Sequence, residues 1–395
     1  MTTPTSDPEV AAALAALTLE ERVQLLTGRD FWSTLPIEKI GLRRILVSDG
    51  PSGVRGETWD ERDPSLNLPS ATALASSWDP DIARRYGAAA AVEARRKGVD
   101  VVLGPTINLH RSPLGGRHFE AFSEDPVLTA DLAAAYVTGV QDNGVGATPK
   151  HYVANDSETD RFTVDVRVSD RALRELYLLA FEKAVTEARA WLVMSSYNSV
   201  NGTTATENDL LETPLNSEWG FDGVVISDWT AVRSLAAAQA SQDLVMPGPD
   251  GPWGDALVAA VRSGEIAEAV VDRKVARILV LARRVGAFGG SPAEPAWVED
   301  GAAFARHAAD QPRGATGAQR SRAHVLGRAW PHQCRGHGAP GAGAEIAPRN
   351  PAPVHGLDSF GASPRRRKVR RFAGGGADAA RKSWGIAACR RRSGR

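Results

Sequence analysis

Short apolar runs alternate with helical stretches along the first 300 residues of the chain. The runs are typical of buried strands and occupy residues 45–47, 99–103, 144–148, 191–194, 224–226 and 244–246. Start and stop signals between them predict helices over residues 18–28, 79–98, 125–140, 169–188 and 266–285. Strands that alternate with helices form a parallel sheet that the helices cover. The pattern therefore predicts an α/β fold.

Polar and ionisable residues follow the predicted strands repeatedly. Asp49, the Lys150-His151 pair, Tyr197 and Asp228 all stand at or just after the end of such a run. A parallel barrel builds its active site from the carboxyl ends of its strands. We therefore expect a TIM-like (β/α)8 barrel, with an irregular ring because only six strands are visible. A doubly wound sheet is the alternative, and it would gather polar groups at a single switch point.

The formal net charge of zero hides two different kinds of sequence. Residues 312–395 carry 16 Arg and 2 Lys against Glu345, Asp358 and Asp378, a balance of about +15. This segment has no sustained apolar periodicity, so it cannot bury enough apolar surface to offset the entropy of ordering. We expect a barrel domain over residues 1–300, the start of a linker helix over 301–311 and a disordered basic tail over 312–395.

Several kinds of site are disfavoured by the composition. Both cysteines, Cys334 and Cys389, lie in the basic segment, so the acidic part has no thiol chemistry or disulfide framework. His110 and His118 do not form a metal-ligand pattern, and nothing in the sequence calls for a metal or an organic cofactor. No export signal or membrane-spanning run is visible, which favours a cytoplasmic location. The oligomeric state is left open.

Seven segments, in order, resemble glycoside hydrolase family 3. The segment Gly223-Val-Val-Ile-Ser-Asp228-Trp229 is similar to that family's nucleophile motif. The other six segments lie upstream and begin at Ser48, Gly104, Gly115, Phe122, Lys150 and Met194. Retaining glycoside cleavage needs a carboxylate nucleophile, a second carboxyl group for proton transfer and groups that fix the sugar hydroxyls. The acidic part of the chain supplies the first and the third of these.

The resemblance implies a role for each matching residue. Asp228 would be the nucleophile, with Trp229 as an apolar platform and Tyr197 beside it. The implied substrate-binding residues are Asp49, Arg117, Lys150, His151, Arg161, Met194, Tyr197 and Trp229. Lys150 and Arg117 are cations, so near Asp228 they would keep that carboxylate ionised.

Each residue also has a structural interpretation. An aspartate after a strand is commonly a cap or turn residue, which applies to Asp228 and to Asp49. Lys150 can be a solvated lysine, His151 a core histidine and Trp229 ordinary core packing. Arg117 can serve a structural ion pair with Glu120, Glu124 or Asp125.

The chain departs from the family after the barrel. Family β-glucosidases continue into a sandwich domain that brings the acid/base glutamate to the barrel mouth. Residues 302–310 resemble the start of the helix that leads there, and the resemblance then ends. A shifted reading frame of a GC-rich gene explains residues 312–395 better than a genuine basic extension. The acid/base residue is therefore unknown, and we expect little turnover of unactivated glycosides.

The resemblance implies a retaining, exo-acting β-glycosidase that releases terminal β-D-glucosyl residues from an oligosaccharide or β-glucoside. A β-xylosidase or related specificity is an alternative. A single-domain N-acetylglucosaminidase is disfavoured, because Lys150 to Asp156 lacks that group's catalytic histidine. A non-catalytic sugar-binding relic is a second class. Nucleic-acid binding through the arginines of the tail is disfavoured.

Overall fold

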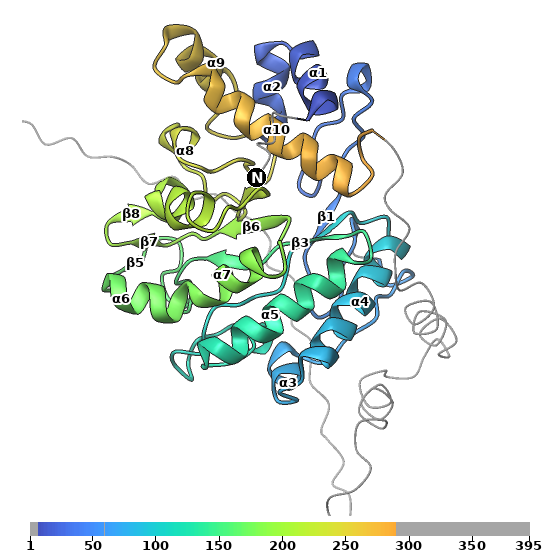
Figure 1. The fold of residues 1–395 in the computed structure, drawn as a ribbon, viewed down its shortest axis with the longest axis vertical. Helices are drawn as coiled ribbons and strands as arrows, with labels where there is room; N and C mark the ends of the chain where they lie inside the picture. Colours follow the sequence, from blue (N-terminus) through green and yellow to red (C-terminus); the bar gives the residue numbers. More distant parts are fainter. Residues whose placement is uncertain (1–6, 59, 290–395) are drawn as a thin grey trace, which may run out of the picture. The chain divides into compact units, whose positions relative to one another are not determined.

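Helices and strands alternate in the computed structural model, which describes residues 7–58 and 60–289 (Figure 1). The strands are β1 (Val47–Ser48), β2 (Val101–Val102), β3 (Gly146–Ala147), β4 (Lys150–Tyr152), β5 (Asp165–Val166), β6 (Leu192–Ser195), β7 (Ser199–Val200), β8 (Thr203–Thr204) and β9 (Val224–Ser227). The helices are α1 (Pro8–Ala16), α2 (Leu19–Leu25), α3 (Ala71–Ala75), α4 (Pro80–Arg96), α5 (Pro126–Gln141), α6 (Asp170–Ala172), α7 (Leu179–Thr186), α8 (Ala236–Gln239), α9 (Gly254–Ser263) and α10 (Glu268–Arg284). The fold is thus mixed α/β, as predicted.

Parallel pairing dominates the strands. One sheet has the order β1-β2-β3, and a second has the order β4-β6-β9, with every pair in both sheets parallel. A third, small sheet joins β5 to β7 in parallel and β7 to β8 as an antiparallel hairpin. The sequence pattern did not predict this small sheet, since its strands have two residues each and no apolar run.

Backbone hydrogen bonds continue past the edges of the two parallel sheets. Residues 244–246, which were predicted as a strand, pair with β9 through Leu244 and with Thr27 through Val245. The amide of Val245 donates to Leu26 O at 2.9 Å, and the amide of Gly28 donates to Val245 O at 2.9 Å. Residues 32–34 then run antiparallel to residues 45–47, where Ser33 faces Leu46. Two short segments before β1 therefore extend the pairing, and neither carries a recognisable strand pattern.

The predicted helices are confirmed, with one interruption. Residues 169–188 contain α6 and α7, but a π-helical turn at Leu173–Tyr177 joins the two. Helices α1, α3, α8 and α9 were not predicted. The expected linker start at residues 301–311 and the tail at 312–395 lie outside the described residues.

Three helices begin with the same dipeptide, aspartate followed by proline. Asp7, Asp79 and Asp125 each accept hydrogen bonds from the second and third backbone amides of α1, α4 and α5. Proline suits the first helical position because its missing N–H has no partner there in any case. Helix α2 begins differently, with the predicted reciprocal capping box between Thr18 and Glu21. Local hydrogen bonds therefore cap all four helix starts.

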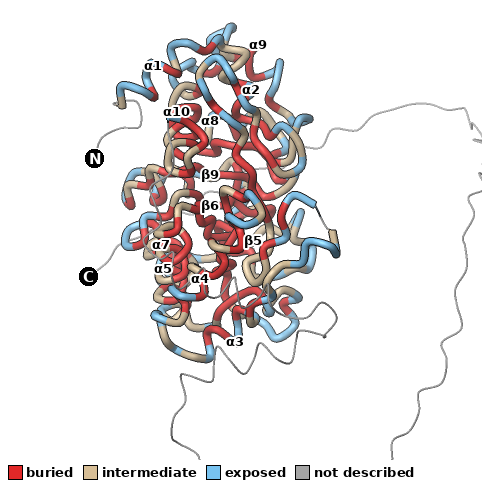
Figure 2. The backbone as a smooth tube through the Cα atoms, turned by 90° about the vertical axis from the view of Figure 1, so that its right-hand side faces the viewer, coloured by how far each residue is buried: buried red, intermediate tan, exposed pale blue. Residues whose placement is uncertain are grey.

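Both faces of the parallel strands are buried. In β2, β6 and β9 alternate residues belong to two separate apolar clusters: Val102, Val193 and Val225 pack with α4, α5 and α7, whereas Val101, Leu192 and Val224 pack with α1, α2, α9 and α10. Figure 2 shows β6 and β9 within mainly buried backbone. Burial on both faces explains why the strands read as unbroken apolar runs rather than as alternating ones.

Helices α4 and α5 approach each other closely at two glycines. A Cβ atom added to Gly139 of α5 would lie 2.0 Å from Arg84 O of α4, and one added to Gly87 of α4 would lie 2.3 Å from Tyr136 O of α5. Both clashes are with backbone atoms, which cannot rotate away. Only glycine allows this approach.

Gly139→Ala is expected to destabilise the protein by about 1–3 kcal/mol, as overpacking of a tight interface does. The sign of this stability change is informative, because without the close contact alanine would stabilise a helix relative to glycine by about 1 kcal/mol. Chemical denaturation measures the change. A variant that is as stable as the wild type or more stable would show that the helices move apart without cost.

Two cations of α10 bind residues 240–243, the segment that directly precedes the paired residues 244–246. Lys274 donates to Ala240 O at 2.7 Å and to Gln242 O at 2.6 Å, and burial lowers its pKa to about 8. Arg277 forms an ion pair with Asp243 at 3.1 Å, with side-chain exposures of 7% and 1%. Asp243 also accepts the amide of Val225 in β9 at 2.9 Å. This ion pair therefore ties α10 to the middle of the sheet.

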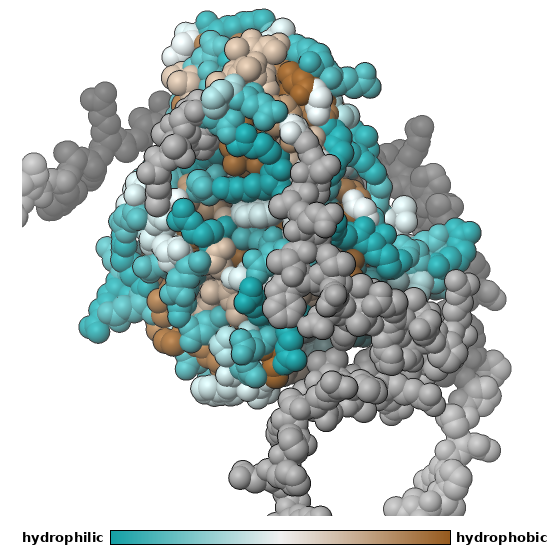
Figure 3. Space-filling view, turned by 45° about the vertical axis from the view of Figure 1, so that its right-hand side comes forward, coloured by the Kyte–Doolittle hydropathy of each residue, from teal (hydrophilic) through white to brown (hydrophobic). Residues whose placement is uncertain are grey.

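The part of the surface that Figure 3 shows in colour is mostly hydrophilic. Within residues 7–58 and 60–289, no helix has the length and apolar content needed to cross a membrane.

Candidate active site

The structure brings together the polar residues that follow the parallel strands. Asp49 follows β1, Lys150 and His151 lie in β4, Tyr197 comes two residues after β6 and Asp228 directly follows β9. Contacts between side chains connect these positions, as described below. The carboxyl ends of several strands therefore contribute to one site, whereas a doubly wound sheet would use a single switch point.

Asp228 is buried, and hydrogen bonds hold one of its two carboxylate oxygens. Its Oδ1 accepts the Tyr197 hydroxyl at 2.9 Å and the Trp229 amide at 2.8 Å. Its Oδ2 lies 3.5 Å from Nε2 of His151. The Trp229 amide is a local contact, but Tyr197 and His151 come from two other strands, which a turn residue would not require.

Burial raises the pKa of Asp228 above its usual value, although Lys150, the Trp229 amide, Tyr197 and Arg117 all favour the charged form. The sequence prediction that Lys150 and Arg117 keep this carboxylate ionised is correct for the direction of their effect. Burial outweighs their effect on the pKa, because the cost of removing a carboxylate from water is larger here. Asp228 is therefore a more basic carboxylate than an exposed aspartate.

His151 is neutral and has a defined tautomer. Burial and the positive charges of Arg117, Lys150 and Arg161 hold its pKa well below the usual value. Oδ1 of Asn108 accepts the His151 backbone amide at 2.8 Å and lies 3.2 Å from Nδ1, so Nδ1 carries the proton. Nε2 is then an acceptor, and it lies 3.5 Å from Nη2 of Arg117. His151 is therefore not a satisfied core histidine, because its second nitrogen faces the site.

Asp49 and Lys150 form an ion pair across two strands. Nζ of Lys150 donates to Oδ1 of Asp49 at 2.8 Å, and Arg55 lies 3.6 Å from Oδ2. Burial opposes the charge of Asp49, yet Lys150 and Arg55 together lower its pKa to about 2. The Lys150 side chain is only 3% exposed, so the interpretation as a solvated lysine is wrong.

Arg117 combines a structural ion pair with a position in the site. Its Nε donates to Glu120, one of the three partners considered from the sequence. Its Nη1 lies 3.6 Å from Oε1 of Glu158, and its Nη2 faces His151. Burial opposes the charge, but Glu120, Glu158 and Asp228 raise the pKa of the guanidinium. The interpretation of Arg117 as part of a structural ion pair is therefore confirmed, and its binding to a sugar stays a prediction.

Arg161 reaches the site over an aromatic surface. Its guanidinium lies 5.2 Å from the ring centre of Tyr197 and 4.8 Å from that of Phe162, and it donates to Glu158 at 2.7 Å. The rings of Phe162 and Tyr197 meet edge to face at 4.6 Å. Since the Tyr197 hydroxyl donates to Asp228, Tyr197 lies between Arg161 and the candidate nucleophile.

Trp229 is partly buried and belongs to an aromatic cluster that packs against the apolar core. Its ring centre lies 5.2 Å from that of Trp32 and 6.1 Å from that of Phe31, and its Nε1 donates to Phe31 O at 3.0 Å. Phe31 is 55% exposed. The cluster thus combines packing against the core with an exposed ring, and the platform role of Trp229 stays a prediction.

Met194 is the one predicted sugar contact that lies in the core. It is 1% exposed and packs in the apolar cluster of the strands with Ile226. A contact between Met194 and a sugar stays a prediction.

Sequence reasoning missed Asn108, Glu158, Phe162 and the pair Phe31-Trp32. Asn108 and Glu158 lie within or beside the recognised motifs, but their side-chain partners are not readable from spacing.

A pocket adjoins the site and is lined by Arg117, His151, Glu158 and Asp156, among others. Asp156 is a buried carboxyl group whose pKa rises to about 6, chiefly through burial. The ring centres of His110 and His118 lie 4.4 Å apart, and the two rings are tilted by 48°. Among the residues that the structure describes, no three His, Cys, Asp or Glu side chains are placed to hold one metal ion.

Comparison with known proteins identifies relatives for most of the described part. The family profile described as "Glycosyl hydrolase family 3 N terminal domain" matches residues 7–281. A beta-glucosidase of Rhizobium radiobacter is 50% identical over 282 residues, which are 71% of this chain and 34% of that protein. Beta-glucosidase B of Emericella nidulans is 46% identical over 287 residues, again 71% of this chain and 34% of that protein. The chain thus spans about a third of the length of these curated relatives.

Solved structures are similar over the same region. Beta-glucosidase 3B from Thermotoga neapolitana in complex with glucose has a TM-score of 0.68 and 37% identity, covering 76% of this chain and 46% of that one. Beta-glucosidase from Kluyveromyces marxianus in complex with glucose also has a TM-score of 0.68 and 37% identity, covering 76% and 38%. The family profile covers well over half of the chain, and the chain belongs to glycosyl hydrolase family 3.

Proposed function

We propose that residues 7–281 form the nucleophile-bearing domain of a retaining β-glucosidase, built as an irregular (β/α)8 barrel. Eight backbone segments support the barrel: residues 26–28 and 32–34, then β1, β2, β3 with β4, β6, β9 and residues 244–246. Hydrogen bonds join each segment to the next, and Arg29 N to Ser33 O joins the first two. The ring is irregular because residues 32–34 run against their neighbour.

Asp228 carries the proposed chemistry. Its carboxylate attacks the anomeric carbon of a terminal β-glucosyl residue while the bond from that carbon to the leaving oxygen breaks. Water then hydrolyses the glycosyl-Asp228 ester. The observation that carries this proposal is the fixed carboxylate: Tyr197 and the Trp229 amide orient Oδ1, and His151 faces Oδ2.

The surrounding residues suit a bound sugar. Asp49 accepts hydrogen bonds from sugar hydroxyls, whereas Lys150, Arg117 and Arg161 donate to them. The aromatic cluster at Trp229 offers an apolar face for the ring of the sugar. The neutral His151 accepts a hydrogen bond at Nε2. Hydroxyl groups need both donors and acceptors, and this site provides both.

The leaving oxygen needs a proton, and no described residue is assigned to supply it. A leaving group that is already a stable anion, such as a dinitrophenolate, needs no proton. We therefore expect this chain to form the glycosyl-Asp228 ester with such substrates and to cleave ordinary glucosides slowly, since loss of general acid catalysis costs a factor of about 10² to 10⁴.

Incubation of the full chain with dinitrophenyl 2-deoxy-2-fluoro-β-glucoside tests the proposal. The intact mass is expected to rise by one fluoroglucosyl group, with the label on Asp228. Faster labelling by the matching fluoroxyloside would instead favour a β-xylosidase. Glucose binding without any labelling would favour a non-catalytic sugar-binding relic.

A further inference from the structure

Glu158 lies between the two arginines of the site and contacts both. Its Oε2 accepts a hydrogen bond from Nη1 of Arg161 at 2.7 Å, and its Oε1 lies 3.6 Å from Nη1 of Arg117. The carboxylate and the two guanidinium groups are each about a quarter exposed, so water screens these interactions only in part. One negative charge thus serves two cations on separate loops.

Both arginines lead from Glu158 to Asp228. Arg117 faces Nε2 of His151, which lies 3.5 Å from Oδ2 of Asp228. Arg161 packs over the ring of Tyr197, whose hydroxyl donates to Oδ1 of Asp228. Two chains of contacts therefore lead from the Glu158 carboxylate to Asp228. One reaches Oδ2 through Arg117 and His151, and the other reaches Oδ1 through Arg161 and Tyr197.

The other contacts of Arg117 and Arg161 do not replace those made by Glu158. Glu120 holds Nε of Arg117 and also accepts a hydrogen bond from Thr106 at 3.1 Å, but it has no contact with Arg161 among the described residues. The other contacts of Arg161 within the described part of the chain are with aromatic faces, which attract a guanidinium without fixing its orientation. Within that part, Glu158 is the carboxylate that contacts both arginines.

We propose that Glu158 is a positioning residue: it fixes Arg117 and Arg161 relative to each other so that both are prepared to bind the sugar above Asp228. This inference rests on the proposed function, since it assigns the arginines to a bound sugar. Glu158 itself touches neither Asp228 nor its hydrogen-bond partners. Its effect on the nucleophile passes through the two arginines and through its charge.

A negative charge at Glu158 is expected to oppose ionisation of Asp228, because like charges disfavour each other. The titratable and charged groups that face Asp228 or hold those that do are Lys150, His151, Arg117, Arg161, Tyr197, Asp49 and Glu120. Glu158→Gln removes a negative charge and leaves the arginines less neutralised. The pKa of Asp228 is then expected to fall by on the order of half a pH unit.

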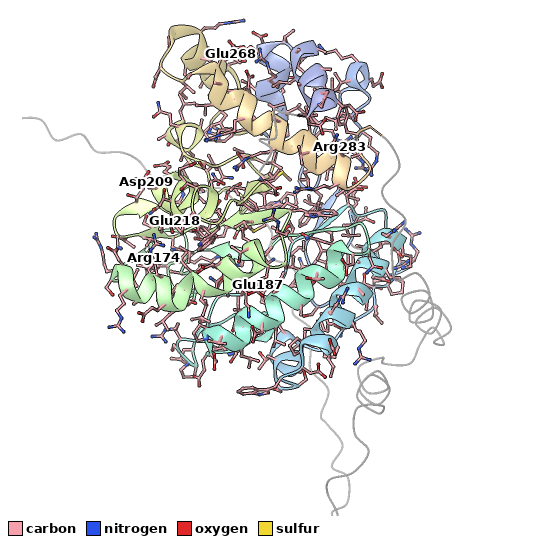
Figure 4. All side chains as sticks on the ribbon, viewed as in Figure 1. Arg174, Glu187, Asp209, Glu218, Glu268 and Arg283 are labelled. Atoms are coloured by element: carbon pink, nitrogen blue, oxygen red, sulfur yellow. The ribbon has the colours of Figure 1, made fainter. Side chains whose placement is uncertain are left out.

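Two variants separate charge from geometry. Glu158→Gln keeps the size of the side chain and removes the charge, whereas Glu158→Asp keeps the charge and shortens the reach, so that it cannot contact both arginines. A matched control is Glu218→Gln, which removes the carboxylate of the surface pair Arg174–Glu218 (Figure 4). The pair has exposures of 53% and 41%, and neither residue has a part in the site.

Two measurements on the full chain test the proposal. Carboxyl ¹³C NMR titration gives the pKa of Asp228, with its signal assigned by Asp228→Asn. The fluoroglucoside concentration that gives the half-maximal labelling rate measures the apparent affinity for the sugar. We expect Glu158→Gln to lower the pKa and weaken saturation on the order of tenfold, Glu158→Asp to weaken saturation with an unchanged pKa, and Glu218→Gln to change neither.

The possible results are distinguishable. If the wild type labels and both Glu158 variants label with unchanged saturation, the proposal is overturned. If the wild type does not label, the proposed function fails, and the NMR titration still decides: a lower Asp228 pKa in Glu158→Gln supports the arrangement, and an unchanged pKa overturns it. If Glu158→Gln does not fold, saturation in Glu158→Asp decides in the same two ways.

Discussion

Asp228→Asn is expected to abolish labelling by the fluoroglucoside, with a rate lower by on the order of 10⁴-fold or more. The amide has the shape of the carboxylate but cannot attack the anomeric carbon. Intact mass spectrometry over several hours measures the loss. Asp222→Asn is the matched control, because Asp222 precedes β9, forms an ion pair with Arg284 at 2.9 Å and is 44% exposed. It should label at the wild-type rate.

Asp228→Asn is expected to keep or raise the stability of the protein even though it abolishes labelling. Burial raises the pKa of Asp228 in the folded protein, so the folded state binds the proton more tightly than the unfolded state does. The ionised carboxylate therefore costs stability once the pH exceeds the folded pKa, and asparagine removes that cost. At pH 7 the melting temperature of Asp228→Asn should equal or exceed that of the wild type. Loss of labelling together with a lower melting temperature would point to a structural role instead.

Asp243→Ala is expected to destabilise the protein by about 3–5 kcal/mol, the effect of breaking a buried ion pair by removing one partner. Arg277 would stay buried with its remaining contacts to Asn216 and Phe221 O, and its charge would have no carboxylate partner among them. The Val225 amide would lose its side-chain acceptor at the same time. Urea denaturation followed by tryptophan fluorescence measures the difference.

An exposed ion pair provides the control for this prediction. Arg171 and Glu175 lie 2.9 Å apart with exposures of 84% and 59%, so Glu175→Ala should change stability by less than about 1 kcal/mol. A double variant, Asp243→Leu with Arg277→Met, should lose less than Asp243→Ala, because no unpaired charge remains buried. Equal losses in the single and double variants would show that packing, not charge, dominates at this position.

The sequence was informative about the elements that depend on local physics. Aspartate-proline dipeptides and a capping box start four helices where the pattern predicted three of them, and the apolar runs of β6 and β9 mark strands that are buried on both faces. It was uninformative where tertiary contacts replace local preference. Residues 26–28 and 32–34 have no strand pattern, yet they extend the pairing because β1 and residues 244–246 offer unpaired backbone groups.

For the site, the sequence by itself determined which residue types stand at the ends of strands, and motif resemblance singled out Asp228, Lys150, His151 and Arg117. The tertiary structure decided how they act. Burial, which depends on every neighbouring element, raises the pKa of Asp228 against its cationic neighbours. The tautomer of His151 follows from Asn108, 43 residues earlier. The link from Glu158 to two arginines exists only in three dimensions, because hydrogen bonds depend on distance in space and not on separation along the chain.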